Sequence, residues 1–406
     1  MSTPEALYRN AIDLNRYSNS VARRVINSYN DIILDAVDQL QRLIPNVTDG
    51  ELPTITESQR AARLRSILAQ LKESLETWAG DSAVLTAGEL QGLAELQSEF
   101  VEEQLKKVLP RGSRNIVRTV EISPQFAQAV VTTDPTQINV VTLSDDLFAA
   151  VQGAPQTFSL TAAQGATITL PNGKIVEKAF RGIAEDQAEL FSQVVRDGLL
   201  TGETTDQISS RLKGKLRYNQ PGSPKQIAAK GGQATTVANN QVQALVRTSI
   251  NQVANAASQQ VYEANQDITK KYRYVATLDT RTSAICRALD GREFEYGKGP
   301  KPPQHFNCRS TTVAVVDYEG LGFDPPPAGK RAAAGGMVPA DQSYGQWLAR
   351  PENKARKIEA LGKEKARYFD RLTRKHGARD AMAKLVRDDG SELTLQDLRR
   401  RYGKLD

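Results

Sequence analysis

The strongest constraint on how this 406-residue chain can fold is the placement of its two cysteines. Both lie in one short window, at Cys286 and Cys308, and one of the two histidines, His305, lies between them. Two sulfur ligands and an imidazole, two of them separated by only two residues, suit a zinc ion held in a tight knuckle. The window must then bring these three side chains together at one point.

A structural zinc ion normally has four ligands, so a fourth donor is needed. Asp279, at the end of an expected strand shortly before Cys286, is the preferred candidate; Asp290 or a water molecule are the alternatives. Asp290 precedes Gly291, a pair typical of a turn, and His376 lies far along the chain. Four neighbours are expected to be structural, two as partners of the aspartates and two as an apolar cover: Arg281, Arg309, Phe294 and Tyr296.

Other interpretations of the window remain open at this level. Cys286 can be a nucleophile with His305 as its base, although no nucleophile elbow is recognisable nearby. The cysteines can also be buried apolar residues, since free cysteine is often buried. A Cys286–Cys308 disulfide has little support, because residues 1–20 have no apolar core of a signal peptide and nothing else indicates secretion.

The rest of the chain indicates a predominantly helical α+β fold. Aromatic residues make up only 6%, and alanine and glutamine are plentiful, which favours helices over a large β-sandwich. Apolar residues recur at helical spacing over 5–44, about 56–78, about 85–108 and about 240–265. Four parts are expected: a helical N-terminal domain (1–112), a β-rich insert (113–178), a helical domain with a short β and knuckle element (179–324), and a linker with a basic helical segment (325–406).

Local patterns predict the remaining elements. Short β-branched runs between turn residues predict strands over about 117–176, and two further strands, 270–278 and 310–316, flank the cysteine window. The polar stretch 213–240 is expected to be a loop, and the Pro/Gly/Ala stretch 325–336 a linker. A basic helix over about 353–376 follows, and short helices are expected around Ala378 and Leu395.

Positive charge is concentrated at the C-terminal end. The net charge is +6, and residues 350–406 alone carry 17 Lys/Arg against 10 Asp/Glu, so the preceding residues are close to neutral. This segment can contact DNA or an acidic partner surface, or it can be a solvated helix with mixed charges. No apolar run is long enough to span a membrane, so no membrane contact is expected.

An ordered set of short motifs surrounds the cysteines: Asp279–Ser283, Cys286, Asp290-Gly291 and His305–Ser310. The set resembles the signature of the Mu F-type head morphogenesis proteins of tailed phages. Other stretches fit the same family: Gly198–Gly202, Arg247-Thr248, Tyr344–Leu348, Leu361-Gly362 and Asp389-Gly390. The resemblance covers about residues 180–400 and departs at Ser249, where an acidic residue is expected after Arg-Thr.

The resemblance implies a minor head protein, a virion structural protein and not an enzyme. Its place would be inside the phage head near the portal, after synthesis in the host cytoplasm, in several copies per particle. Its partners would be the portal protein, the major capsid protein, or both, with packaged DNA contacted through the basic C-terminal helix. Its role would be head morphogenesis, with genome packaging or ejection as a further role. The alternatives are an enzyme that depends on Cys286 and His305, or a host-directed effector carried in the head.

Overall fold

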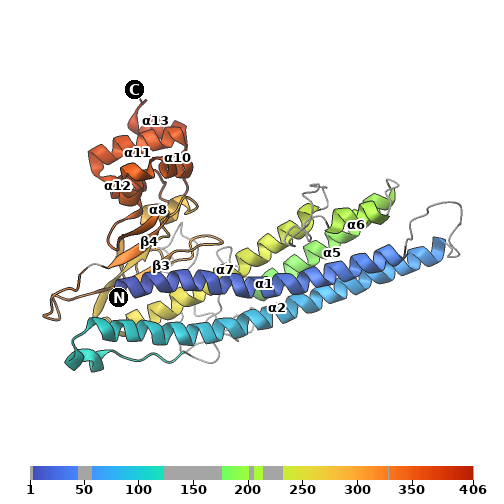
Figure 1. Cartoon of the computed structure of the whole chain (residues 1–406), viewed down its shortest axis with the longest axis horizontal. Coiled ribbons are helices and arrows are strands. Elements are labelled where there is room, and N and C mark those ends of the chain that lie inside the picture. Colours follow the sequence, from blue (N-terminus) through green and yellow to red (C-terminus); the bar gives the residue numbers. More distant parts are fainter. Residues whose placement is uncertain are drawn as a thin grey trace.

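Long helices form one elongated half of the molecule, which we call the stalk (Figure 1). The computed structural model describes residues 3–43, 57–122, 176–200, 205–213, 232–327 and 329–405. Helices α1 and α2 run antiparallel along the long axis, and three more helices pack against them. The stalk helices are α1 (Thr3–Leu43), α2 (Glu57–Val108), α5 (Val176–Leu200), α6 (Thr205–Lys213) and α7 (Gly232–Ala264).

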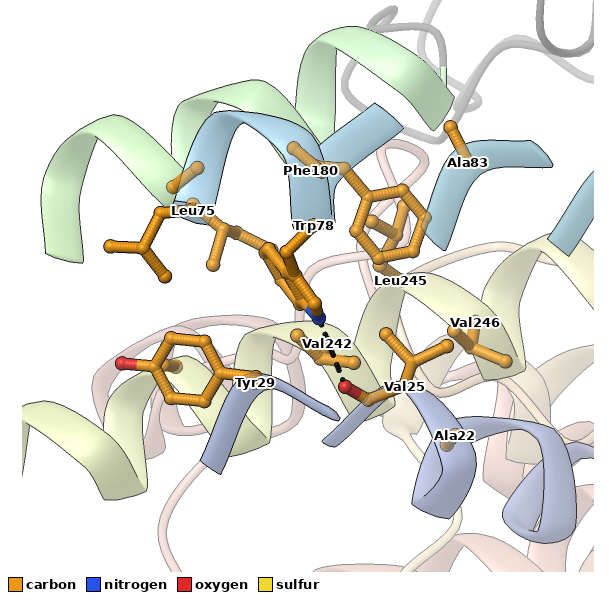
Figure 2. Close-up of a cluster of buried hydrophobic side chains, with 14 of the residues drawn as sticks. Ala22, Val25, Tyr29, Leu75, Trp78, Ala83, Phe180, Val242, Leu245 and Val246 are labelled. Atoms are coloured by element: carbon orange, nitrogen blue, oxygen red, sulfur yellow. Dashed lines mark hydrogen bonds between the residues drawn. The ribbon is translucent and has the colours of Figure 1, made fainter. Parts of the chain in front are cut away.

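An apolar seam holds the stalk together, with Trp78 of α2 near its centre (Figure 2). The indole Nε1 donates to the carbonyl of Val25 at 3.1 Å, and the ring lies 5.3 Å from Tyr29 and 5.8 Å, edge to face, from Phe180. Buried alanines such as Ala79 allow the helices to approach closely. Three helices far apart in the sequence therefore share one core around a single large side chain.

The expected helices of the stalk exist, but their limits differ. The two helices expected over 56–78 and 85–108 are one continuous helix, α2. Gly80 lies inside this helix, although glycine is about 1 kcal/mol less favourable than alanine in a helix interior. The burial of Ala79 and Ala83, on either side of it, stabilises the helix by more than this cost. Most of the expected β-rich insert, and most of the expected loop over 213–240, lie outside the described residues. The described start of the insert is a 3₁₀ helix, η1 (Arg111–Ile116), followed by residues 117–122 without regular secondary structure, so the strand expected from residue 117 does not form in this described part.

A three-stranded antiparallel sheet follows the stalk. Its central strand is β1 (Thr269–Val275), which pairs with β2 (Glu293–Glu295) on one side and β3 (Thr311–Val316) on the other. A short helix, α8 (Ala284–Leu289), connects β1 to β2. We call residues 268–317 the knuckle unit. The strands predicted on either side of the cysteine window are confirmed, with β1 ending three residues earlier than expected.

The stretch expected to be a linker is instead a hairpin. Strands β4 (Lys330–Ala333) and β5 (Gly336–Pro339) pair antiparallel, and Ala334 N–H donates to the carbonyl of Leu278 at 2.8 Å. The linker prediction was wrong because Ala-rich composition carries no signal for this pairing. Gly335 and Gly336 have positive φ angles of 102° and 136°, which only glycine adopts easily at a tight turn.

Short helices close the C-terminal end, and we call them the cap. They are α9 (Tyr344–Leu348), η2 (Pro351–Asn353), α10 (Lys354–Leu361), α11 (Lys363–His376), α12 (Ala378–Ala383) and α13 (Leu395–Tyr402). The single basic helix expected over 353–376 forms two helices, α10 and α11. The break falls at Gly362, whose φ of +75° ends α10. Tyr344, Trp347 and Phe369 are fully buried in the cap core. Among the described helices, none is both long and apolar enough to cross a membrane.

Candidate metal centre

The three predicted sulfur and imidazole ligands meet at one point of the knuckle unit. Cys286 lies in the first turn of α8, which is capped by Ser283, and His305 and Cys308 lie in the loop before β3. The Sγ atoms of Cys286 and Cys308 are 3.7 Å apart, and Cys286 Sγ is 3.4 Å from His305 Nε2. All three donor atoms lie within 4.8 Å of one another. The sequence prediction that these residues converge is confirmed by this geometry.

These separations fit a tetrahedral zinc ion. Bond lengths of about 2.3 Å to sulfur and about 2.0–2.1 Å to nitrogen place two ligand sulfurs about 3.8 Å apart and a sulfur and a nitrogen about 3.5 Å apart. The imidazole is also oriented correctly, because His305 Nδ1 lies 2.8 Å from the carbonyl of Phe306. A carbonyl can only accept, so Nδ1 carries the proton and Nε2 faces the sulfurs.

The protonation of the metal-free cluster favours cation binding. Burial raises the pKa of Cys308, but the Cys286 thiol, the His305 imidazole and the Ser310 N–H all interact with its sulfur and bring the pKa well below its ordinary value. The pKa of Cys286 is raised, because its hydrogen is held by Cys308 and because it is buried. The lowered pKa of Cys308 favours its thiolate, which is the form that a metal binds.

The structure does not bring Asp279 to this cluster. Arg309 holds both of its carboxylate oxygens at 2.5 and 2.8 Å, and the Thr282 hydroxyl and the Arg281 N–H add donors at 3.1 and 3.0 Å. Burial raises the pKa of Asp279, but the pairing with Arg309 outweighs it and the pKa is lowered overall. The predicted Arg309–Asp279 contact exists, and it directs the carboxylate away from the sulfurs.

Two other polar groups lie beside the three candidate ligands, where a fourth ligand of a metal ion would be needed. Ser283 Oγ is 2.8 Å from His305 Nε2, and the Tyr274 hydroxyl is 3.2 Å from Cys286 Sγ. Phe294 packs against the cysteines as expected, whereas Tyr296 belongs to a neighbouring apolar cluster. The aromatic cover is therefore made by Phe294 and by Tyr274, which the sequence did not single out.

Asp290 is not a ligand but a buried junction. Its carboxylate accepts the backbone N–H groups of Ala276 and Tyr344, both at 2.6 Å, and pairs with Arg331 at 3.1 Å. The side chains of Asp290 and Arg331 are 0% and 4% exposed. Gly291 has φ +77°, so the predicted turn is confirmed. The junction joins the knuckle unit, the β4–β5 hairpin and the cap, and no pattern in the sequence indicates Arg331 as its partner.

A polar face of α7 holds the chain that leaves the cluster. The face repeats every three or four residues and comprises Thr248, Asn251, Asn255 and Gln259. Thr248 Oγ1 accepts the N–H of Asn307 at 3.0 Å, and Asn255 Oδ1 accepts the N–H of Thr312 at 3.1 Å. Asn307 has φ +59°, a conformation that asparagine tolerates. Sequence reasoning missed this face, although buried polar residues at helical spacing were a usable signal.

A comparison with known families found a match to the part of the chain that contains this cluster. Residues 189–313 match the family model described as Phage Mu protein F like protein. The matched segment runs from α5 to β3 and includes the polar face of α7 and all three candidate ligands. The family resemblance found in the sequence is thereby confirmed for this segment. Comparisons with curated proteins and with solved structures returned no match.

Proposed function

We propose, on the premise that this chain contains a Phage Mu protein F like segment, that it is a minor head protein of a tailed phage. The observation that carries the proposal is the match over 189–313, which coincides with the best-defined chemical site in the molecule. Its place inside the head near the portal, and its contact with the portal or major capsid protein, are parts of the same proposal. The long stalk helices outside the match offer an extended surface for such contacts.

The test is to remove the gene from the phage and to identify the proteins of purified heads. The protein should be found in wild-type heads, and its loss should give defective heads that a plasmid-borne copy restores. Presence only in infected cells, and never in purified heads, would contradict the proposal and favour the host-directed effector.

Within this function, Cys286, His305 and Cys308 are proposed to hold a structural zinc ion. When bound, zinc would supply folding free energy to a unit with a small apolar core, on the order of 10 kcal/mol in finger peptides. The burial of both sulfurs, which are 1% and 2% exposed, supports a structural role. It argues against Cys286 as a nucleophile, as does its raised pKa, because attack requires an accessible thiolate.

Metal analysis of the purified protein tests the zinc proposal. About one zinc ion per chain is expected, and Cys308→Ser should lose the metal and melt at a lower temperature. Glu293→Gln is the matched control, because it changes a surface ion pair with Arg273 in the same unit and leaves the three ligands and the neighbouring hydroxyls in place. Protein without zinc, together with unchanged melting of Cys308→Ser, would exclude the metal.

The exposed cations of the cap favour a contact with packaged DNA as a second role. They lie at the C-terminal ends of α11 and α13, two helices that contact each other: Arg374, Lys375, Arg399 and Arg401. Arg371 ties the two helices together by donating to the carbonyl of Lys404 at 2.8 Å. The cations are therefore presented by a fixed pair of helices.

Salt dependence tests this role. Binding of duplex DNA should weaken as salt rises from about 50 to 200 mM, and replacing the four cations with glutamine should reduce the salt slope by about 0.9 for each phosphate that is no longer neutralised. Lys72→Gln and Lys107→Gln on the stalk are controls. Binding that does not depend on salt, or that is insensitive to the four changes, would remove the DNA role.

A further inference from the structure

A groove lies beside the metal centre but does not include its ligands. Its volume is about 390 Å³, and it is formed by α1, by the chain that follows β1, and by the β4–β5 hairpin. Asn15, Arg309 and Thr311 also line a smaller adjoining cavity of about 20 Å³, which Arg247 of α7 and the candidate ligand Cys308 border. Four segments that are distant in sequence therefore surround one recess.

Positive charge in this recess exceeds negative charge. Arg281 and Arg309 line the groove and Arg247 borders the adjoining cavity, whereas the described lining of the two contains one carboxylate, Asp279. The fourth arginine of the lining, Arg331, is paired with the buried carboxylate of Asp290.

Arg309 holds both carboxylate oxygens of Asp279, so the arginines best placed for a further anion are Arg281 and Arg247. The Arg281 side chain is 82% exposed and lies 3.7 Å from Asp279. Arg247 donates to the neutral amide oxygen of Asn19 at 2.7 Å. Its pKa is lowered by burial and then by repulsion from Arg309 and Arg281. An anion beside these groups would relieve that repulsion.

The walls indicate what kind of anion fits. Small and aliphatic side chains alternate with two threonines: Val275, Ala276, Thr277, Leu278, Thr311, Ala332, Ala333 and Ala334. Sites for single-stranded nucleic acid combine cations with aromatic side chains on which bases stack, and the described lining of this groove contains no aromatic residue. An aliphatic wall beside arginines suits a peptide whose carboxylate accepts from a guanidinium while small apolar neighbours pack below.

We propose that this groove binds an acidic peptide segment of a partner protein, with a carboxylate against Arg281, beside the Arg309–Asp279 pair. The proposal rests on the groove itself and goes beyond the proposed function, since it holds whether or not the partner is a head protein. The occupant is a peptide because the groove is recessed, lacks stacking surfaces among its described residues and has a volume within the range of about 300–1,000 Å³ typical of ligand sites.

Retention of peptides on the immobilised full-length protein tests the proposal. One pool contains hexapeptides with central Asp-Glu and Ala, Leu, Val or Thr at the other positions, and the matched pool has Asn-Gln at the centre. The acidic pool should be retained about tenfold better, because hydrogen bonds to charged groups contribute about 1.5–3 kcal/mol each. Arg281→Ala should abolish the preference, and the exposed position of Arg281 means that the fold does not depend on this side chain.

Two more variants make the test independent of the loss of one charge. Ala332→Trp should block the groove without changing its charge, whereas Arg23→Ala should have no effect, because Arg23 is an exposed arginine of α1 outside the lining. Equal retention of both pools, or retention that Arg281→Ala and Ala332→Trp leave unchanged, would overturn the proposal. Tighter binding of oligothymidylate or inorganic phosphate, with the same dependence on the variants, would overturn the assignment to a peptide.

Discussion

The stalk and the knuckle unit are held together by different kinds of contact, and α7 takes part in both. One face of α7 buries apolar residues in the seam as far as Ala257, among them Val242, Leu245 and Val246 (Figure 2). Towards its end the helix buries the polar face from Thr248 to Gln259, which hydrogen-bonds the chain around the cluster. One helix therefore makes both kinds of contact, with apolar packing on one face and directed hydrogen bonds on the other, and the two faces overlap over residues 248–257.

This difference separates adaptable contacts from specific ones. Apolar packing depends on volume and shape, so the stalk should tolerate exchanges that conserve volume. Hydrogen bonds in the knuckle unit depend on particular donors and acceptors, and a buried group that loses its partner is costly. The knuckle unit is thus the region in which single polar substitutions should have the larger effect.

The largest effect is expected for Asp290→Asn. The change removes the charge that balances buried Arg331, and breaking a buried pair in this way costs about 3–5 kcal/mol. Urea unfolding measures the loss, and hydrogen exchange should increase around 276–290 and 329–345 while the stalk stays protected. Glu293→Gln, in an exposed pair with Arg273, is the control, with an expected cost below about 1 kcal/mol. Equal losses of unfolding free energy for Asp290→Asn and Glu293→Gln would show that the buried pair stabilises the fold no more than an exposed one.

The second largest effect is expected for Leu75→Ala. The cavity that it leaves in the apolar seam should lower the free energy of unfolding by about 3 kcal/mol. Leu75 is fully buried, whereas Glu73 two residues away is exposed, so Glu73→Ala provides the control. Hydrogen exchange should rise in α1 and α2 and remain low in the knuckle unit. A rise of similar size in both regions would mean that the two halves unfold as one and that the comparison is wrong.

A smaller loss, about 1–3 kcal/mol, is expected for Thr248→Val, which leaves the Asn307 N–H without its acceptor. Ser249→Ala removes a buried hydroxyl that donates only to the carbonyl of Leu245 in its own helix, and it should change little. Thermal unfolding of the two variants separates a contact between elements from a contact within one. Equal destabilisation of both variants would contradict the conclusion that Thr248 positions the loop around Asn307.

The smallest expected effect is a change with pH in the stability that the Asp279–Arg309 pair contributes. The pKa of Asp279 is lower in the folded state, so its pairing with Arg309 stabilises the protein fully above the unfolded value of about 3.9 and is lost as pH falls through the folded pKa. Asp279→Asn should therefore be less stable than wild type near neutrality, and the gap should close in acid. Urea unfolding of metal-free protein measures this, and Asp13→Asn, on an exposed carboxylate, should show almost no gap. A gap that persists in strong acid would contradict the assignment.

Periodicity and residue type in the sequence were enough to predict the helical character and the two strands beside the cysteines, and ligand chemistry with spacing predicted the convergence of Cys286, His305 and Cys308. It failed where a residue's role is set by a distant partner. Gly80 stays inside α2 because of helices that pack on both sides, and the β4–β5 hairpin exists because Ala334 bonds to Leu278.

The misplaced fourth ligand has the same origin. Asp279 and Arg309 are 30 residues apart, and their bidentate contact depends on how the loop before β3 turns. Nothing in the spacing of Asp279 and Cys286 distinguishes a carboxylate that points to the sulfurs from one that points to a guanidinium. Distances along the chain predicted which residues gather, and only the fold decided which atoms face each other.

The buried carboxylate of Asp290 also sets an order of events during synthesis. The ribosome makes Asp290 41 residues before Arg331 and 54 residues before Tyr344. At roughly 5–20 residues per second, the knuckle sequence waits about two to ten seconds for the groups that neutralise its anion. An anion without these partners strongly disfavours burial. A nascent chain that stops before Tyr344 therefore lacks groups that stabilise the Asp290 carboxylate, and its knuckle unit cannot bury that charge favourably.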